Sequence, residues 1–381
     1  MVRVKSKRQA NNKMMALLRE HGLKLVLGTV ATVSFANAFG VEKFQQLVSF
    51  SPTSSTACLD QFYNKTPPYL MRESQQKHSY PLCFNGFNVM YSGVSKTPLW
   101  VAEYLNPTRL SQKIPREDSF HEEQRVASAH RATLQDYKGS GYDRGHMAPN
   151  ADMPNVSAQF DSFSLANMVP QAPKNNQKVW RELEEATRAM VTKQKQDVYL
   201  VTGPAFTAKK LKKIGNGVIV PTAVFKAVYL PKTGVTGAYY APNDNSLTVN
   251  IVSICYLEEQ LGINLFPNLS EDQKRNTYKL PRTASEVKAN QKIAYSHWDA
   301  ESQCAEDVLD AKLSDVQKQF KSQGNVLTAE KNSAQTSASE KNSSATTTAQ
   351  DENPVELPQV ENAIVKQLFN MLLEFILQLL K

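Results

Sequence analysis

The sequence predicts an α+β fold for its central part, from about Cys58 to Gln303. Apolar runs rich in Val, Ile and Tyr are separated by Gly, Pro and Asn, which is typical of strands joined by turns. A helical pattern is clearest from Asn176 to Lys193. Strands and helices interleave without the regular alternation of a parallel α/β sheet, so the α+β class is favoured.

The strongest strand signal is a predicted hairpin around Asn85-Gly86. Leu82-Cys83-Phe84 precedes this dipeptide and an apolar run from Phe87 to Tyr91 follows it. Asn and Gly both tolerate positive φ, as a tight hairpin turn requires. Further strands are expected at Leu99–Tyr104, Val198–Thr202, Val218–Leu230, Gly237–Ala241 and Leu247–Cys255.

The main predicted helix rests on apolar periodicity. Val179, Leu183, Ala186 and Met190 recur at three- and four-residue steps with charged residues between them. Two more helices are expected at Tyr256–Leu261 and Ala284–Tyr295.

The flanks predict an exported protein with a tail. Residues 1–38 read as a signal peptide with a long basic n-region, an apolar run at Leu25–Phe35 and a small-x-small site at Ala36-Asn37-Ala38. The alternative is an uncleaved membrane anchor. We therefore expect a periplasmic, cell-surface or extracellular location. A lead-in at 39–57, a folded domain at 58–323, a disordered low-complexity linker at 324–358 and an amphipathic helix at 359–381 complete the predicted organisation.

The C-terminal helix leaves two interpretations open. Its wide face of Leu, Ile, Phe and Met could self-associate, giving a possible homodimer, or dock on the folded domain. Contact with a membrane surface is the alternative.

The net charge of +8 is unevenly distributed. Residues 1–38 carry +6 and residues 324–381 carry −3, which leaves +5 for residues 39–323. The folded part is only mildly basic, so binding of a polyanion would require a local basic patch.

Four cysteines, Cys58, Cys83, Cys255 and Cys304, suggest two disulfides in an exported chain. Three connectivities are possible. The local pairs Cys58–Cys83 and Cys255–Cys304 are preferred because each closes a loop within one end of the domain, and free buried thiols are the alternative.

The chemistry is concentrated between residues 143 and 184. Asp143-Arg144-Gly145-His146-Met147-Ala148-Pro149 is followed by Asn167-Met168-Val169-Pro170-Gln171, and then by Asn176-Gln177, Trp180 and Leu183-Glu184. Metal-assisted cleavage of a phosphodiester needs a base for water, oxygen ligands for a cation and a positive group on the phosphate. This stretch supplies all three.

These motifs resemble the DNA/RNA non-specific endonuclease family of ββα-metal nucleases, from about Cys58 to beyond Cys255. The resemblance implies a His-Me finger fold with a central antiparallel sheet flanked by helices. It also implies hydrolysis of DNA and RNA, single- or double-stranded, that leaves 5′-phosphate ends and needs one Mg²⁺, with Mn²⁺ as a substitute.

The resemblance implies a role for each site residue. His146 is the expected general base, held by a backbone carbonyl, and Asn176 the expected Mg²⁺ ligand, although Asn is also a good helix cap. Asn175 is expected to be a cap or surface residue. Glu184 lies roughly 12 Å further along a helix, so it is expected to act through metal-bound water.

The remaining site residues are phosphate-binding or positioning candidates. Arg144 is expected to bind the scissile phosphate, and Arg116 to bind phosphate as well. Asn167 and Arg188 are further catalytic candidates, Asn167 close to the metal water. Arg188 could instead pair with Glu184 at i, i+4. Asp143 should orient its neighbours, and Gly145 should permit close substrate approach or an unusual φ.

The sequence therefore predicts a secreted, sugar-non-specific endonuclease. The alternatives are a catalytically inactive nucleic-acid-binding module, a phosphodiesterase for small substrates, and a surface interaction factor that acts through its C-terminal helix.

Overall fold

The computed structural model describes residues 58–323. The predicted signal peptide (1–38), lead-in (39–57), linker (324–358) and C-terminal helix (359–381) lie outside the described residues, so they remain predictions. Within the described range, no helix is both long enough and apolar enough to span a bilayer.

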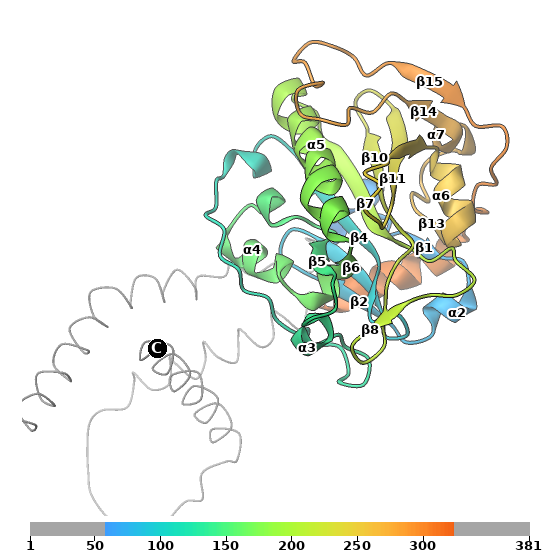
Figure 1. Cartoon of the computed structure of the whole chain (residues 1–381). Coiled ribbons are helices and arrows are strands. Elements are labelled where there is room, and N and C mark those ends of the chain that lie inside the picture. Colours follow the sequence, from blue (N-terminus) through green and yellow to red (C-terminus); the bar gives the residue numbers. More distant parts are fainter. Residues whose placement is uncertain (1–57, 324–381) are drawn as a thin grey trace, which may run out of the picture. The chain divides into compact units, whose positions relative to one another are not determined.

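A seven-stranded antiparallel sheet in the order β12-β11-β10-β7-β4-β3-β2 forms the centre of the described region (Figure 1). Its strands are β2 (Ser79–Cys83), β3 (Asn88–Ser92), β4 (Thr97–Leu105), β7 (Val198–Ala205), β10 (Ala223–Leu230), β11 (Val235–Pro242) and β12 (Asn250–Val252). Four two-stranded pairs surround it: β1 (Tyr69–Leu70) with β13 (Ile263–Asn264), β5 (Asp143–His146) with β6 (Met168–Gln171), β8 (Lys213–Ile214) with β9 (Val218–Ile219), and β14 (Asn276–Tyr278) with β15 (Tyr295–Trp298).

Short helices connect the strands. They are α2 (Glu73–Gln76), α3 (Leu134–Tyr137), α4 (Val156–Ser162), α5 (Arg181–Gln194), α6 (Ile254–Leu261) and α7 (Glu271–Arg275), with a π-helical turn, η6 (Asn175–Trp180), directly before α5. Single 3₁₀ turns occur at η1 (Leu59–Gln61), η2 (Tyr63–Lys65), η3 (Arg109–Ser111), η4 (Asn150–Asp152) and η5 (Leu165–Asn167). Residues 310–323 are also helical.

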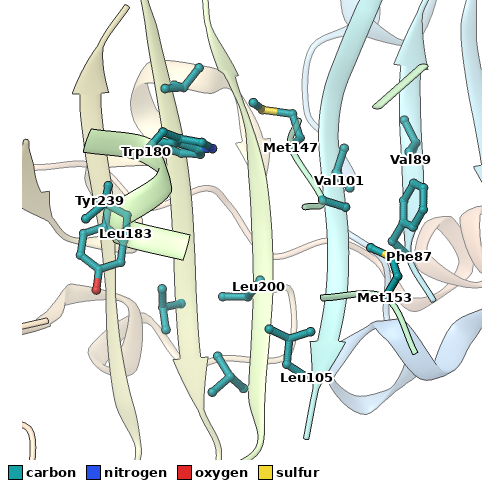
Figure 2. Close-up of a cluster of buried hydrophobic side chains, with 14 of the residues drawn as sticks. Phe87, Val89, Val101, Leu105, Met147, Met153, Trp180, Leu183, Leu200 and Tyr239 are labelled. Carbon is teal, nitrogen blue, oxygen red and sulfur yellow. The ribbon is translucent and has the colours of Figure 1, made fainter. Parts of the chain in front are cut away.

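Both faces of the sheet are buried because side chains alternate along the strands. On β10, Val224 and Val228 pack into the core beneath α5, whereas Phe225 and Tyr229 pack into the core on the opposite face. Figure 2 shows the first core, in which Trp180 and Leu183 at the start of α5 lie over the sheet. The second core contains Phe320, whose ring contacts those of Phe62 and Trp100. The expected α+β class with a central antiparallel sheet and flanking helices is confirmed.

The predicted hairpin joins β2 to β3, but its turn differs from the expectation. Phe84 N donates to Phe87 O, and Gly86 has a φ of 98°. Asn85 does not adopt positive φ. Its backbone and side-chain nitrogens both donate to Asp161 Oδ2, so a tertiary contact sets its conformation.

Two predicted strands are shorter than expected. The run Val218–Leu230 is divided into β9 and β10, because Pro221 between them has no N–H to donate. The run Leu247–Cys255 contributes only β12 to the sheet. Ser253 then accepts a hydrogen bond from Tyr256 N and begins α6, so this predicted helix is confirmed with an earlier start.

The helix predicted at Ala284–Tyr295 is wrong. This segment consists of turns and extended chain, and β15 begins at Tyr295. Several of its carbonyl groups accept hydrogen bonds from side chains of α5: Lys193 Nζ donates to Ala284 O and Gln194 Nε2 to Gln291 O. Contacts with α5 therefore replace helical hydrogen bonds.

Both disulfides form in the preferred local pairing. Cys58–Cys83 ties the first described turn to β2, and Cys255–Cys304 ties α6 to the chain after β15. No cysteine in residues 58–323 is free.

Candidate active site

The motif at residues 143–146 forms strand β5, which pairs with β6 outside the central sheet. Arg144 and His146 lie two residues apart, so they share one face of the hairpin. The hairpin is anchored directly after His146, where Met147 and Ala148 are completely buried in the core beneath α5. Figure 2 shows Met147 in this core. The catalytic candidates are therefore attached to a rigid part of the molecule.

Asn167 braces this hairpin from behind. Its Oδ1 accepts from Ala148 N at 2.9 Å, and its Nδ2 donates to Ala148 O at 2.8 Å and to Ser162 O at 2.9 Å. The side chain is completely buried and does not line the cleft that holds His146. Its hydrogen bonds thus hold the backbone of the hairpin, and the catalytic role expected for Asn167 stays a prediction.

The second part of the site is the π-helical turn η6 and the start of α5. Trp180 and Leu183 are almost completely buried over the sheet (Figure 2), which stabilises this attachment by roughly 2 kcal/mol for each side chain. The opposite side of the turn presents Asn176, Gln177 and Glu184 to the cleft. A π turn is a common device at functional sites because it shifts the direction in which side chains point.

These elements surround a cleft of about 880 Å³. Of the predicted site residues, it brings together Arg116, Arg144, His146, Asn176 and Glu184. Asn167 and Arg188 lie outside it. The cleft is also lined by Phe120, Leu134, Tyr137, Lys138, Tyr142, Asp143, Pro149, Asn150, Gln177, Lys178 and Arg181.

The His146 ring is positioned by aromatic contacts. Phe163 meets it edge-on at 5.0 Å between ring centres, and Phe120 lies at 5.7 Å. The expected hydrogen bond to a backbone carbonyl is absent within residues 58–323, and Nε2 is buried without a partner. Burial, reinforced by the positive charges of Arg116 and Arg144, lowers the pKa of His146 to about 3. The ring is therefore neutral at neutral pH and retains a free proton acceptor.

Arg116 and Arg144, which both line the cleft, differ in whether they form an ion pair. The Arg144 guanidinium lies 3.9 Å from the centre of the Phe120 ring and forms no ion pair with any described residue. Arg116 Nε pairs with Asp118 Oδ1 at 2.6 Å, and more than half of its side chain is exposed. Arg144 is thus the freer group for an incoming anion, held in place by a cation–π contact.

Asn176 has a fixed orientation. Its Nδ2 donates to Asp143 Oδ2 at 2.9 Å, and Gln177 Nε2 donates to the same oxygen at 2.8 Å. Asp143 therefore orients its neighbours, as expected. Because the amide nitrogen is committed to this bond, the Asn176 carbonyl oxygen is left for a cation in the cleft.

Two neighbours of these residues have roles that the sequence did not predict. Asn175 is neither a cap nor a surface residue: it is buried, accepts from Gln171 Nε2 at 2.6 Å and donates to Pro242 O at 2.8 Å. Gly145 has an ordinary φ, and a Cβ there would overlap the Gln171 side chain. The requirement for glycine at this position is thus internal packing instead of close approach of substrate.

Glu184 and Arg188 occupy successive turns of α5 but do different things. Burial raises the pKa of Glu184 to about 7, against the opposing charges of Arg188 and Lys226. Arg188 Nη1 pairs with Asp152 Oδ1 at 2.9 Å beneath the cleft. Its guanidinium therefore ties α5 to the η4 turn, and neither of its two expected roles, phosphate contact or a simple pair with Glu184, describes this contact.

A cluster of buried charges lies between α5 and the sheet. Glu103 pairs with Arg109 at 3.3 Å, and Arg109 Nε donates to Asp152 O at 2.7 Å. Lys226 is fully buried, donates to Thr202 Oγ1 at 3.0 Å and lies near the Trp180 ring. Burial raises the pKa of Glu103 to about 8. These residues sit behind the cleft and do not line it.

The sequence around this cleft matches a known protein family. Residues 69–272, more than half of the chain, match the model described as DNA/RNA non-specific endonuclease. The chain belongs to this family. It is therefore a nuclease that hydrolyses phosphodiester bonds, in a family of metal-dependent enzymes, and the resemblance inferred from the motifs is confirmed.

Several relatives of this nuclease are similar over about half of its length. Human mitochondrial endonuclease G is 35% identical over 219 residues, which cover 52% of this chain and 71% of the relative. Nuclease C1 of Cunninghamella echinulata var. echinulata is 32% identical over 224 residues, 53% of this chain and 86% of the relative. A chain in the crystal structure of the EndoG/EndoGI complex aligns with a TM-score of 0.46 at 25% identity, covering 51% of this chain and 89% of its own.

The donor set of the cleft fits a hard cation. Residues 58–323 contain no group of three or more His, Cys, Asp or Glu side chains able to hold a metal. The cleft offers instead the Asn176 carbonyl oxygen and the Glu184 carboxylate. A hard cation such as Mg²⁺ prefers oxygen ligands and keeps several waters, so one protein oxygen and a substrate phosphate are sufficient.

Several residues that line the cleft of this nuclease were not predicted as part of the site, among them Phe120, Lys138, Tyr142, Lys178 and Arg181. Arg181 could have been found, because it lies four residues after Gln177 and three before Glu184 on one helix face. Phe120 and Tyr142 carried no local signal, since an aromatic residue between motifs is equally compatible with the core.

Proposed function

We propose that this nuclease is an exported endonuclease that hydrolyses DNA and RNA with His146 as general base and one Mg²⁺, leaving 5′-phosphate ends. The observation that carries the proposal is the convergence of His146, Arg144, Asn176 and Glu184 on one cleft, with a base nitrogen and a guanidinium that have no hydrogen-bonding or ionic partner among the described residues.

His146 takes a proton from water, and the water oxygen bonds to phosphorus as the bond from phosphorus to the 3′ oxygen breaks. The 3′ oxygen leaves and takes up a proton from solvent, and the proton on His146 returns to solvent. A pKa of about 3 makes the ring a weak base in the free enzyme. Burial is the main cause of this low pKa, and the positive charges of Arg116 and Arg144 add to it. The negative charge of a scissile phosphate offsets the effect of the two arginines and so raises the pKa of His146. Arg144 meanwhile binds the phosphate with a planar fork of donors.

Asn176, oriented by the hydrogen bond to Asp143, would hold the cation through its carbonyl oxygen. The Glu184 carboxylate would orient the cation's water shell. When bound, Mg²⁺ stabilises the negative charge that builds up on the phosphate and on the leaving 3′ oxygen, and Mn²⁺ can take its place. Recognition of phosphate instead of base edges accounts for the tolerance of both sugars and of any sequence.

Export is supported by the chain's N-terminus and by its cysteines. Residues 1–38 have the composition of a signal peptide, and both pairs of cysteines are disulfide-bonded. We propose a periplasmic, cell-surface or extracellular location. Fractionation of the native host with an antibody to the folded domain tests this, and recovery of the protein only from the cytosol would contradict it.

The activity is tested on supercoiled plasmid and on long single-stranded RNA, using the purified full chain. We expect cleavage of both polymers with Mg²⁺ and none with EDTA. The product ends should accept label from a polynucleotide kinase only after phosphatase treatment, because they carry 5′-phosphate. Turnover of a nitrophenyl phosphodiester without cleavage of either polymer would indicate a small-substrate phosphodiesterase, and binding without cleavage would indicate an inactive module.

A further inference from the structure

A second hollow of about 600 Å³ adjoins the catalytic cleft. It lies between α3 with its following turn and the loop that contains β8, two segments that lie side by side near β5 and β6 (Figure 1). Lys138 lines both the cleft and this hollow, so the two are neighbours. No predicted site residue belongs to the hollow, and the mechanism proposed above does not use it.

The hollow presents positive charge. Lys138, Lys212 and Lys213 line it, all three are exposed, and none forms an ion pair with a described residue. Asp136 is the one acidic residue in its lining, and it is buried. Its carboxylate accepts from Thr133 N at 2.7 Å and from Asn216 N at 2.5 Å, so it caps α3 and fixes the β8 loop instead of pairing with the lysines.

Lys212 connects the hollow to the cleft. Its Nζ donates to Tyr142 OH at 3.2 Å and lies 5.0 Å from the centre of the Tyr142 ring. Tyr142 itself lines the catalytic cleft. The lysine is thus held against the cleft wall, and its remaining two N–H donors are available to an anion.

We infer that Lys138, Lys212 and Lys213 form a track for the phosphates that flank the scissile bond on a polynucleotide, an inference that rests on the proposed function. Each strand of a duplex carries one phosphate for about every 3.4 Å of helix axis, so a strand that leaves the cleft past Lys138 presents further phosphates to the two other lysines. The folded domain is only mildly basic as a whole, and a polyanion must therefore be gripped by a local cluster of this kind. The track adds affinity for long polymers without reading sequence.

The test measures how binding to a mixed-sequence DNA duplex depends on salt, with full-chain protein in EDTA so that no cleavage occurs. Each lysine that neutralises a phosphate contributes about 0.9 to the slope of log K against log salt. The variant Lys212→Ala/Lys213→Ala should lower the magnitude of that slope by about 2 and bind more weakly at low salt. The control Lys232→Ala/Lys288→Ala removes two exposed lysines that line neither the cleft nor the hollow, and its slope should match the wild type.

Equal slopes in the track variant and the control would overturn the track. Wild-type cleavage of a dinucleotide with Mg²⁺, a substrate too short to reach Lys212, tests the proposed function separately. Cleavage of the dinucleotide together with equal slopes would disprove the track alone. Absence of cleavage of both the dinucleotide and long polymers would disprove the proposed function.

Discussion

The catalytic cleft and the buried charge cluster behind it both contain charged side chains, but these side chains differ in whether they have hydrogen-bonding or ionic partners. In the cleft, Arg144 and the His146 ring have no hydrogen-bonding or ionic partner among the described residues. Behind it, Arg109, Asp152 and Arg188 are joined by ion pairs and hydrogen bonds. Polar groups that are left unpaired cost stability, so they persist where a ligand supplies the missing partner. The difference separates groups that act on substrate from groups that hold the scaffold.

The largest effect is expected for His146→Ala. Loss of a general base lowers the rate by about 10²–10⁴-fold, while circular dichroism should show an unaltered fold because the ring forms no hydrogen bond in the described region. His297→Ala, which removes an exposed histidine outside the cleft, is the control and should cleave plasmid at the wild-type rate. Near-wild-type cleavage by His146→Ala would remove the central assignment.

Substitutions of the adjacent residues Asn175 and Asn176 should separate a loss of stability from a loss of metal binding. Asn176→Ala should raise the Mg²⁺ concentration for half-maximal rate by roughly tenfold or more and hardly change stability. Asn175→Ala should instead cost about 1–3 kcal/mol of stability, because Gln171 and Pro242 O lose a buried partner. Metal titrations and thermal unfolding of both variants check this. An unchanged titration for Asn176→Ala would count against its role as a ligand.

A smaller effect should appear in the pH profile. With a pKa of about 7, Glu184 is mostly protonated at pH 6 and mostly ionised at pH 8, so a rate that needs the carboxylate rises about tenfold over this range. Glu184→Gln should lose this rise. Because burial raises the pKa, the same group also makes the folded state less stable as pH increases from 4.5 towards 7. An identical pH profile in the variant would assign the rise to another group.

The smallest effect on catalysis is expected from substitutions in the buried charge cluster behind the cleft. Arg188→Met leaves Asp152 buried without its partner and should cost roughly 3 kcal/mol of stability, with a several-fold loss of rate because α5 carries Glu184. Lys274→Met breaks a similarly buried pair with Glu258 on α6, away from the cleft. It should lower the melting temperature but leave the rate unchanged. Equal losses of rate would show that general destabilisation, not position behind the cleft, explains the Arg188 result.

The periodicity of apolar residues predicted secondary structure correctly where those residues pack against the core. The helix from Asn176 was predicted because its apolar residues repeat at helical steps, and those residues indeed face the sheet. The helix predicted at Ala284–Tyr295 was wrong because side chains of α5 capture its carbonyl groups. Hydrogen-bond partners remote in the chain determine the conformation of that segment, and no local sequence pattern reveals such partners.

By itself, the sequence determined the fold class, the nuclease family and part of the set of residues that meet in the cleft, because residue types suited to phosphate chemistry are concentrated in short motifs. Only the tertiary structure decided which of these residues remain free to act. Asn167 and Arg188 are occupied by backbone and carboxylate partners, whereas Arg144 and His146 are not. A side chain's hydrogen-bonding capacity is the same wherever it lies, but its use depends on which atoms folding brings within about 3 Å of it.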